Sequence, residues 1–271
     1  MSLPASPHCV ITGAASGFGR ALALVLAPRG ANLVLSDIDV PACQETARLC
    51  DMAGAKGTFA MRVDVTQLGD VQALAAASNG PIDLVVNNAG ISAGGSIGEL
   101  SIETWRATIA VDLWGVIHGC HVFTPILRRQ GHGHVLNMAS AAGLISAPGM
   151  GPYNVAKAGV VALSETLSGE LLGTGVGVTV LCPTFFKSDI AKSGRFFEET
   201  SRKMAEKLVD SGKDAQEIAR RALADVERGA LYSLPMADAR WLWRIKRAAP
   251  TAFYKLLVAR AVKRAAARLN D

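Results

Sequence analysis

The sequence predicts an α/β protein with a doubly wound parallel sheet in one domain, and three observations predict it. Short apolar runs alternate along the chain with longer stretches of helical pattern. The runs are continuously apolar rather than alternating in polarity, which is typical of parallel strands buried on both faces. A glycine-rich turn joins the first run to the first helical stretch. Together these features predict successive βαβ units.

Each apolar run is expected to form a strand, and each stretch between runs a helix. The expected strands are 8–13, 31–37, 58–64, 82–87, 134–140 and 176–183, with a short closing strand near 231–234. The expected helices are 18–27, 41–53, 68–77, 103–129 and 153–172. No repeat or linker interrupts this order, so residues 1–237 should form the domain and 238–271 a basic, aromatic, helical C-terminal extension.

Composition indicates a globular protein of a reducing compartment. Half of the 271 residues are hydrophobic, which is enough for a large core. The five cysteines include no Cys-x-x-Cys pair, which argues against disulfides and a zinc site. The first strand begins near His8, which leaves no room for a signal peptide, and no apolar run reaches the roughly 18–20 residues that span a bilayer. We therefore expect a cytoplasmic protein.

Positive charge is concentrated in the extension. Residues 238–271 hold nine Lys or Arg and two acids, a net +7, so the preceding residues carry −2 of the total +5. The main domain is therefore not expected to bind nucleic acid. His118 and His121 share a predicted helix without a carboxylate cluster, so we expect packed or solvent-facing histidines and no metal site.

The first candidate site is the glycine-rich turn Thr12–Gly19, which follows a strand and opens a helix. Its glycines allow a tight turn and a close approach of backbone to a pyrophosphate, and the helix N-terminus offers free N–H groups. The residues expected to contact a dinucleotide here are Gly13, Ser16, Gly17, Phe18 and Gly19.

Acidic and small residues at the ends of later strands extend this site. Asp37 ends the second strand 24 residues after Gly13, where a carboxylate can bind the adenosine ribose hydroxyls and would repel a 2′-phosphate. NAD is therefore favoured over NADP. The further expected cofactor contacts at strand ends are Asp64, Val65, Asn88, Ala89 and Gly90.

The second candidate site is a proton-transfer set of Ser140, Tyr153 and Lys157. Tyr153 and Lys157 are four residues apart in a predicted helix and share one face, and Ser140 ends a strand thirteen residues before the tyrosine. A free phenol has a pKa of about 10, and a nearby ammonium lowers it by favouring the phenolate. We expect Tyr153 to exchange a proton with an alcohol or ketone, Ser140 to hold the substrate oxygen, and Lys157 to bind the nicotinamide ribose as well.

These residues together resemble the short-chain dehydrogenase/reductase family. Thr12–Gly19 matches its Thr-Gly-x-x-x-Gly-x-Gly turn, Asn87–Gly90 its Asn-Asn-Ala-Gly segment, and the three catalytic candidates its serine and Tyr-x-x-x-Lys. The resemblance implies a Rossmann-type fold, NAD(P)-dependent conversion of an alcohol/carbonyl pair, and homo-oligomerisation through the long helices, with dimer and tetramer both left open. It also implies that residues 184–212 form a lid over the substrate.

Two departures from the family pattern bear on the site. Asp112 stands where the family usually has an asparagine whose backbone carbonyl helps hold a water in a proton relay to the lysine. We count Asp112 among the catalytic candidates and expect the relay to persist through its backbone. The second departure lies at Pro183–Ser188, where Thr184 replaces the usual glycine and Ser188 keeps a hydroxyl for the nicotinamide carboxamide. Pro183 and Ser188 complete the expected cofactor contacts.

The primary functional prediction is an NAD-dependent dehydrogenase of a hydrophobic secondary alcohol or ketone. The lid phenylalanines, with Met204 and Leu208, either form an apolar substrate pocket or anchor the lid to the core. One alternative is a 3-oxoacyl-thioester reductase of the same family, against which Asp37 and the extension argue. Another is a dinucleotide-sensing or scaffold protein with weak catalysis, for which Asp112 is the only indication.

The extension has two interpretations. Arg260, Arg264 and Arg268 recur every four residues, and Leu257, Ala261 and Leu269 contribute to another face. A basic amphipathic helix with aromatic residues can lie on an anionic membrane surface, which would make the protein peripheral to a membrane. The favoured interpretation is a helix docked on its own domain or on a partner subunit, because charged faces are usually solvated.

Overall fold

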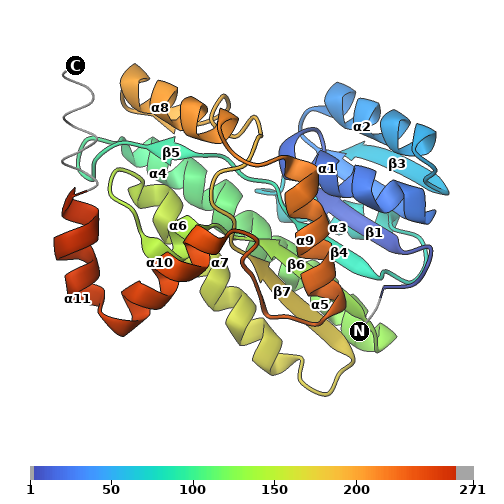
Figure 1. The fold of residues 1–271 in the computed structure, drawn as a ribbon. Helices are drawn as coiled ribbons and strands as arrows, with labels where there is room; N and C mark the ends of the chain where they lie inside the picture. The colour runs from blue at the N-terminus through green and yellow to red at the C-terminus, as the bar shows by residue number, and fades with distance from the viewer. Residues whose placement is uncertain (1–2, 261–271) are drawn as a thin grey trace.

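The computed structural model describes residues 3–260, and its centre is a parallel sheet of seven strands in the order β3-β2-β1-β4-β6-β7-β9 (Figure 1). The chain reverses its direction of strand addition between β1 and β4. In doubly wound sheets, ligands bind at the carboxyl ends of the strands beside such a reversal. The strands are β1 His8–Thr12, β2 Asn32–Asp37, β3 Gly57–Arg62, β4 Leu84–Asn87, β6 Gly133–Met138, β7 Val176–Leu181 and β9 Tyr232–Ser233.

Helices pack on both faces of the sheet and divide the core into two clusters. Alternate strand residues point to opposite faces: Val10 belongs to one cluster and its neighbour Ile11 to the other. One face is covered by α1 Gly17–Leu26, α2 Val40–Met52 and α9 Ala215–Glu227. The other face is covered by α3 Leu68–Ala77, α5 Gly115–Gln130 and α7 Gly151–Glu170. Burial on both faces explains why the strand sequences are continuously apolar.

The expected fold class and all seven expected strands are confirmed, with ends that differ by one or two residues. The expected single helix over 103–129 is wrong in one respect. The structure divides it into α4 Ile102–Ile109, a π-helical turn η2 Ala110–Trp114, and α5. One extra residue in this turn changes the helix register at Asp112, and π-helical turns of this kind often mark functional sites.

The expectation about apolar length also needs correction. Across the described residues, one continuous helical stretch, Ile102–Gln130, is long and apolar enough by composition to cross a membrane. Apolar residues of this stretch, Val116, Phe123 and Leu127 among them, are buried in the core of the domain. Core helices of this kind meet the same length and composition criteria as a membrane span.

Segments outside the central layers border the carboxyl edge of the sheet. β5 Ala93–Gly94 pairs with β8 Arg195–Phe196, and α8 Glu199–Asp210 lies within the expected lid (Figure 1). A short helix, α6 Ala141–Ile145, follows β6 and was not expected from the sequence.

The C-terminal extension begins as a helix that contacts the domain. It consists of α10 Ala237–Ala248, α11 Pro250–Ala252 and a π-helical segment η3 Phe253–Val258, and α10 runs beside α6 (Figure 1). Phe253 is buried. The expectations for Ala261, Arg264, Arg268 and Leu269 lie outside the described residues.

Candidate active site

The glycine-rich turn lies between the end of β1 and the N-terminus of α1. Gly13 and Gly17 have φ angles of 65° and 51°, in the left-handed region that glycine tolerates best. A Cβ on Gly13 would lie 2.8 Å from the Cα of Ala89, so only glycine fits against the segment that follows β4. The side chain of Ser16 makes no capping hydrogen bond to the helix it precedes. The turn therefore leaves the helix N-terminus available to an anionic ligand.

Asn88 holds the two strand ends of this site together. Its Nδ2 donates to the backbone oxygens of Thr12 and Gly13 at 2.9 and 3.0 Å, and its backbone N–H donates to Thr12 Oγ1 at 2.9 Å. Gly19 faces inward from α1, where an added Cβ would collide with the backbone oxygen of Gly13. Gly19 is therefore a packing residue beneath the turn and does not line the cavity.

Asp37 and Asp64 close the far end of the site. One carboxylate oxygen of Asp37 accepts the N–H of Ala15 at 3.0 Å, which places the acid at the end of β2 beside the turn. Asp64 accepts the backbone N–H and the hydroxyl of Thr66 at 3.0 and 2.7 Å. Both acids line the same cavity as the glycine turn, at the carboxyl edge of the sheet.

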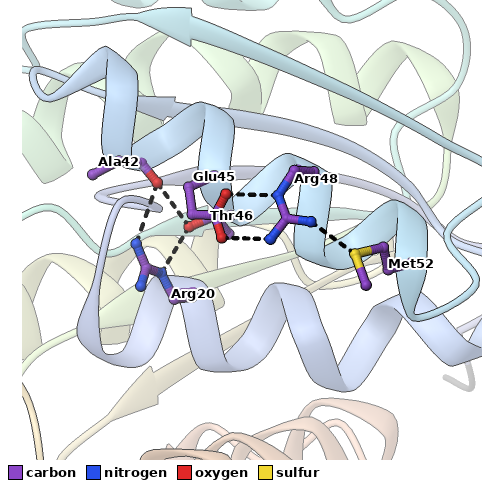
Figure 2. Close-up of polar contacts among 6 residues, drawn as sticks. All are labelled: Arg20, Ala42, Glu45, Thr46, Arg48 and Met52. Carbon is purple, nitrogen blue, oxygen red and sulfur yellow. Dashed lines mark hydrogen bonds and ion pairs between the residues drawn. The ribbon is translucent and has the colours of Figure 1, made fainter.

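Arg20 is the basic side chain that lines this end of the cavity, and it is engaged by the protein itself. Figure 2 shows its guanidinium pointing to Thr46 Oγ1 at 2.9 Å and the backbone oxygen of Ala42 at 3.3 Å, and it also donates to the backbone oxygen of Ala15. These bonds tie α1 to α2. On the outer side of α2, Arg48 pairs with Glu45 and does not enter the site.

The three catalytic candidates come from two adjoining elements. Ser140 is the N-cap of α6, and its Oγ accepts the N–H of Ala142 at 3.1 Å. Tyr153 and Lys157 lie one turn apart on α7, with the lysine Nζ 5.6 Å from the centre of the tyrosine ring. Lys157 Nζ also donates to the backbone oxygen of Met138 at 3.1 Å, and only 1% of this residue is exposed. The structure thus brings together the three residues that the sequence spacing selected.

Asp112 is fully buried behind Lys157. Its Oδ1 accepts the N–H of Ile91 at 2.7 Å, while its Oδ2 lies 3.9 Å from Lys157 Nζ and has no hydrogen-bond partner. The π-helical turn η2 brings this side chain inward. Gly90 makes room for the pair, since a Cβ there would lie 3.1 Å from Asp112 Oδ1 and 3.4 Å from Lys157 Nζ.

Comparison with known proteins decides the family. The model of the short chain dehydrogenase family matches residues 7–198, well over half of the chain. The chain belongs to the short-chain dehydrogenase family. One relative is the Mycobacterium tuberculosis protein named "Putative oxidoreductase SadH", which is 39% identical over 189 residues, 68% of each protein.

Solved structures of the family agree with this assignment. A short-chain dehydrogenase/reductase from Burkholderia phymatum in complex with NAD is 37% identical, with a TM-score of 0.84 over 89% of this chain and 93% of that one. A short-chain dehydrogenase from Sphingobium yanoikuyae in complex with NADPH is 25% identical, with a TM-score of 0.77 over 93% and 96%. This member of the family is therefore an oxidoreductase that acts on CH–OH and C=O groups with a nicotinamide dinucleotide.

A single cavity of about 1250 Å³ joins the glycine turn to the catalytic candidates. Its lining includes every residue proposed from the sequence except Gly19 and Asp112, which lie behind it. The predicted residues that line it are Gly13, Ser16, Gly17, Phe18, Asp37, Asp64, Val65, Asn88, Ala89, Gly90, Ser140, Tyr153, Lys157, Pro183 and Ser188. Ser188 Oγ is buried without a hydrogen-bond partner, which fits a hydroxyl that bonds to a ligand in this cavity.

The other end of the cavity is bordered by the lid and by the C-terminal extension. Met204 and Leu208 of α8 line it, as the interpretation of an apolar pocket requires. Asp238 and Leu242 of α10 line it as well. Sequence reasoning missed these two, because no local motif indicates that a segment at the end of the chain returns to the site.

Burial controls the protonation of the two central acids. Burial raises the pKa of Asp112 to about 6, although the Lys157 ammonium and the Ile91 N–H lower it. Burial also raises the pKa of Tyr153, the charge of Asp112 raises it further, and a hydrogen bond with Ser140 lowers it. The pKa of this phenol is therefore raised, whereas the sequence predicted that Lys157 would lower it. Tyr153 holds its proton at neutral pH, which is the form that protonates a ketone.

Proposed function

We propose that the protein is an NAD-dependent oxidoreductase that interconverts a hydrophobic secondary alcohol and its ketone. One observation carries the choice of substrate class. Among the described residues that line the cavity, the basic ones are Arg20 and Lys157. Arg20 is bonded to protein acceptors at the adenosine end, and Lys157 lies at the catalytic centre. The substrate end therefore offers no cation to a carboxylate or a phosphate.

The charged residues at the substrate end strengthen this proposal. Glu198 and Asp238 line the cavity there, so an anionic substrate would meet carboxylates. The remaining surface is largely apolar, with aromatic and aliphatic side chains from the lid. The apolar lining residues of this end are Ile145, Met150, Phe185, Ile190, Phe196, Met204, Leu208 and Leu242.

The proposed mechanism assigns one task to each catalytic candidate. A bound nicotinamide dinucleotide supplies or accepts the hydride. Tyr153 transfers the proton between its hydroxyl and the substrate oxygen, and Ser140 holds that oxygen by a hydrogen bond. Lys157, fixed by the backbone oxygen of Met138 and balanced by Asp112, holds the nicotinamide ribose. Asp112 acts on Lys157 rather than on the substrate, since it lies behind the cavity wall.

The preference for NAD rests on Asp37 and Arg20. A carboxylate at the end of β2 can accept hydrogen bonds from the two ribose hydroxyls and repels a 2′-phosphate. Arg20, the basic residue that lines this end of the cavity, is engaged by Thr46 and the backbone oxygen of Ala42 (Figure 2), and by the backbone oxygen of Ala15. Both features support NAD over NADP.

The alternative function is reduction of a 3-oxoacyl thioester. The acyl chain of such a substrate would suit the apolar end of the cavity, but its phosphate-bearing carrier arm would meet no cation among the residues that line that end. The other alternative, a dinucleotide-binding protein with weak catalysis, has only the substitution at Asp112 in its favour. The complete set of Ser140, Tyr153 and Lys157 around one cavity supports an enzyme.

The test is a substrate panel with the wild-type protein. Steroids, aliphatic secondary alcohols, polyols and acyl thioesters are assayed with NAD⁺ and NADP⁺, and the matching ketones with NADH and NADPH. The proposal expects turnover of an apolar alcohol or ketone, with NAD(H) at least about 10-fold better in kcat/KM, as one lost charged hydrogen bond would give. Turnover confined to acyl thioesters or polyols would contradict it.

Cellular location and assembly stay predictions. The scattered cysteines predict a cytoplasmic protein, and the resemblance to the family implies a homodimer or homotetramer. For the C-terminal extension, the contacts of α10 with α6 support docking on its own domain. Contact with a membrane through exposed Trp241 and Leu256 stays the alternative prediction for this segment.

A further inference from the structure

We propose that Lys246 and Tyr254 of the C-terminal extension position the catalytic serine by holding the end of α6. This inference rests on the proposed function, because Ser140 is assigned there as the residue that binds the substrate oxygen. It concerns residues beyond the segment 7–198 that the family model matches.

Two side chains of the extension donate hydrogen bonds to the end of α6. Lys246 Nζ donates to the backbone oxygen of Leu144 at 2.7 Å, and the Tyr254 hydroxyl donates to the backbone oxygen of Ile145 at 2.8 Å. Both acceptors are in the last turn of α6, where helix carbonyls lack partners within the helix and carry negative partial charge. Two donors from one distant segment thus cap the same short helix.

The side chains of Lys246 and Tyr254 pack against each other. The ammonium of Lys246 lies 5.7 Å from the centre of the Tyr254 ring, and that ring packs edge-on against Phe253 at 5.4 Å. Phe253 is only 2% exposed, so the ring against which Tyr254 packs is itself buried. The two donors support each other through a cation–π contact.

α6 connects the acceptors at its C-terminus to the catalytic candidates Ser140 and Lys157. α6 has five residues, and it begins at Ser140, so a shift at one end is transmitted to the other. Its middle residue Gly143 touches the backbone of Lys157: a Cβ there would lie 2.5 Å from the lysine oxygen. The extension therefore holds α6 against α7 at the position of the catalytic lysine, with α10 beside it in Figure 1.

The backbone is strained at Ser146, the residue that follows α6. Ser146 follows α6 with a φ of 57°, the one non-glycine residue with positive φ among those described. A residue with a side chain in this conformation is held there by its surroundings. Lys246 Nζ lies 3.4 Å from Ser146 Oγ as well, so the same ammonium stabilises the strained turn. Ile145 and Ala147, on either side of Ser146, line the cavity.

The test compares Lys246→Met and Tyr254→Phe with a matched control, Lys255→Met, in the full chain. Lys255 is an exposed lysine of the same segment, next to Tyr254. We expect Lys246→Met to lower kcat with the best alcohol about 10-fold, because a lost hydrogen bond to a charged group changes an equilibrium by roughly that factor. Affinity for NADH should stay within about two-fold, since the adenosine end is untouched. Lys246→Arg should restore most of kcat.

Hydrogen exchange separates this inference from the proposed function, because it needs no substrate. The amides of Ala142, Gly143 and Ser146, which are hydrogen-bonded in α6, should exchange faster in Lys246→Met and Tyr254→Phe, but not in Lys255→Met. Unchanged exchange in both variants would overturn the inference. Faster exchange with unchanged kcat would overturn the link to Ser140. A wild-type protein inactive on every panel substrate would count against the proposed function alone.

Discussion

The segment that the family model matches and the segment that follows it contribute differently to the site. Residues 7–198 supply the glycine turn, the acid at Asp37 and the catalytic candidates. Residues 199–260 add Met204, Leu208 and Leu242 to the wall of the substrate end, which both segments share, and supply the donors to the end of α6. The first segment carries the chemistry shared by the family, and the second carries the features by which a family member can select its own substrate. Separate substitutions in the two segments should therefore have separable effects.

The largest expected effect is a change in the preference for NAD⁺ over NADP⁺ when Asp37 is replaced. Asp37→Ser removes the carboxylate that we propose binds the ribose hydroxyls, and we expect a 10- to 100-fold fall in kcat/KM for NAD⁺, as the loss of charged hydrogen bonds gives. The kcat/KM for NADP⁺ should rise. The ratio of kcat/KM for NAD⁺ to kcat/KM for NADP⁺, measured with one alcohol, checks this prediction. An unchanged ratio would show that Asp37 does not select the cofactor. The KM of the alcohol at saturating cofactor should change little.

A substitution in the C-terminal segment should instead weaken binding of the alcohol and leave binding of NADH unchanged. Leu242→Gln places an amide in the apolar substrate end, and the lost burial of a leucine should raise the KM of a hydrophobic alcohol about 10-fold. The dissociation constant of NADH should not change. Trp241→Gln is the matched control, since the neighbouring tryptophan is 68% exposed and does not line the cavity. If both variants behave alike, α10 does not shape the substrate site.

The smallest expected effect concerns Asp112. Its folded-state pKa of about 6 lies above the ordinary value of 3.8, so the folded protein binds more protons than the unfolded chain between these values. The contribution of Asp112 to stability is therefore most favourable below pH 4 and falls as pH rises through 6. Between pH 4.5 and 7.5, the free energy of unfolding of the wild type should fall by about 2 kcal/mol relative to Asp112→Asn.

Denaturant unfolding of both proteins at the two pH values measures this difference. Turnover of Asp112→Asn at pH 8 should stay near normal, because the proposed relay uses the backbone at this position. A collapse of turnover in a folded variant would show that the carboxylate has a role of its own. Equal pH dependence of unfolding in both proteins would show that Asp112 is ionised throughout this range.

The sequence predicted the features that depend on local pattern. Continuous apolar runs located the strands, because a strand buried on both faces must be apolar at every position. The spacing of Tyr153 and Lys157 located the catalytic face of α7, because helical geometry is regular. In the glycine turn, the positive φ angles of Gly13 and Gly17 are a local requirement that glycine meets best.

The features that the sequence did not reveal depend on distant contacts. The π-helical turn at Asp112 adds one residue inside a stretch that the sequence predicts as a single helix, and the apolar pattern does not mark it. α6 is too short and too rich in small residues to show a helical pattern. The return of Leu242, Lys246 and Tyr254 to the site depends on how the whole chain packs, and no local signal specifies that contact.

The central claim is that Tyr153 transfers the proton in an otherwise complete dinucleotide site. The most direct test is Tyr153→Phe, assayed with the best substrate of the panel beside a titration with NADH. Because general acid–base catalysis contributes 10²- to 10⁴-fold, we predict a fall in kcat of about 10³-fold. The dissociation constant of NADH should stay within about three-fold, since the glycine turn and Asp37 are unchanged. Full activity of this variant would contradict the claim.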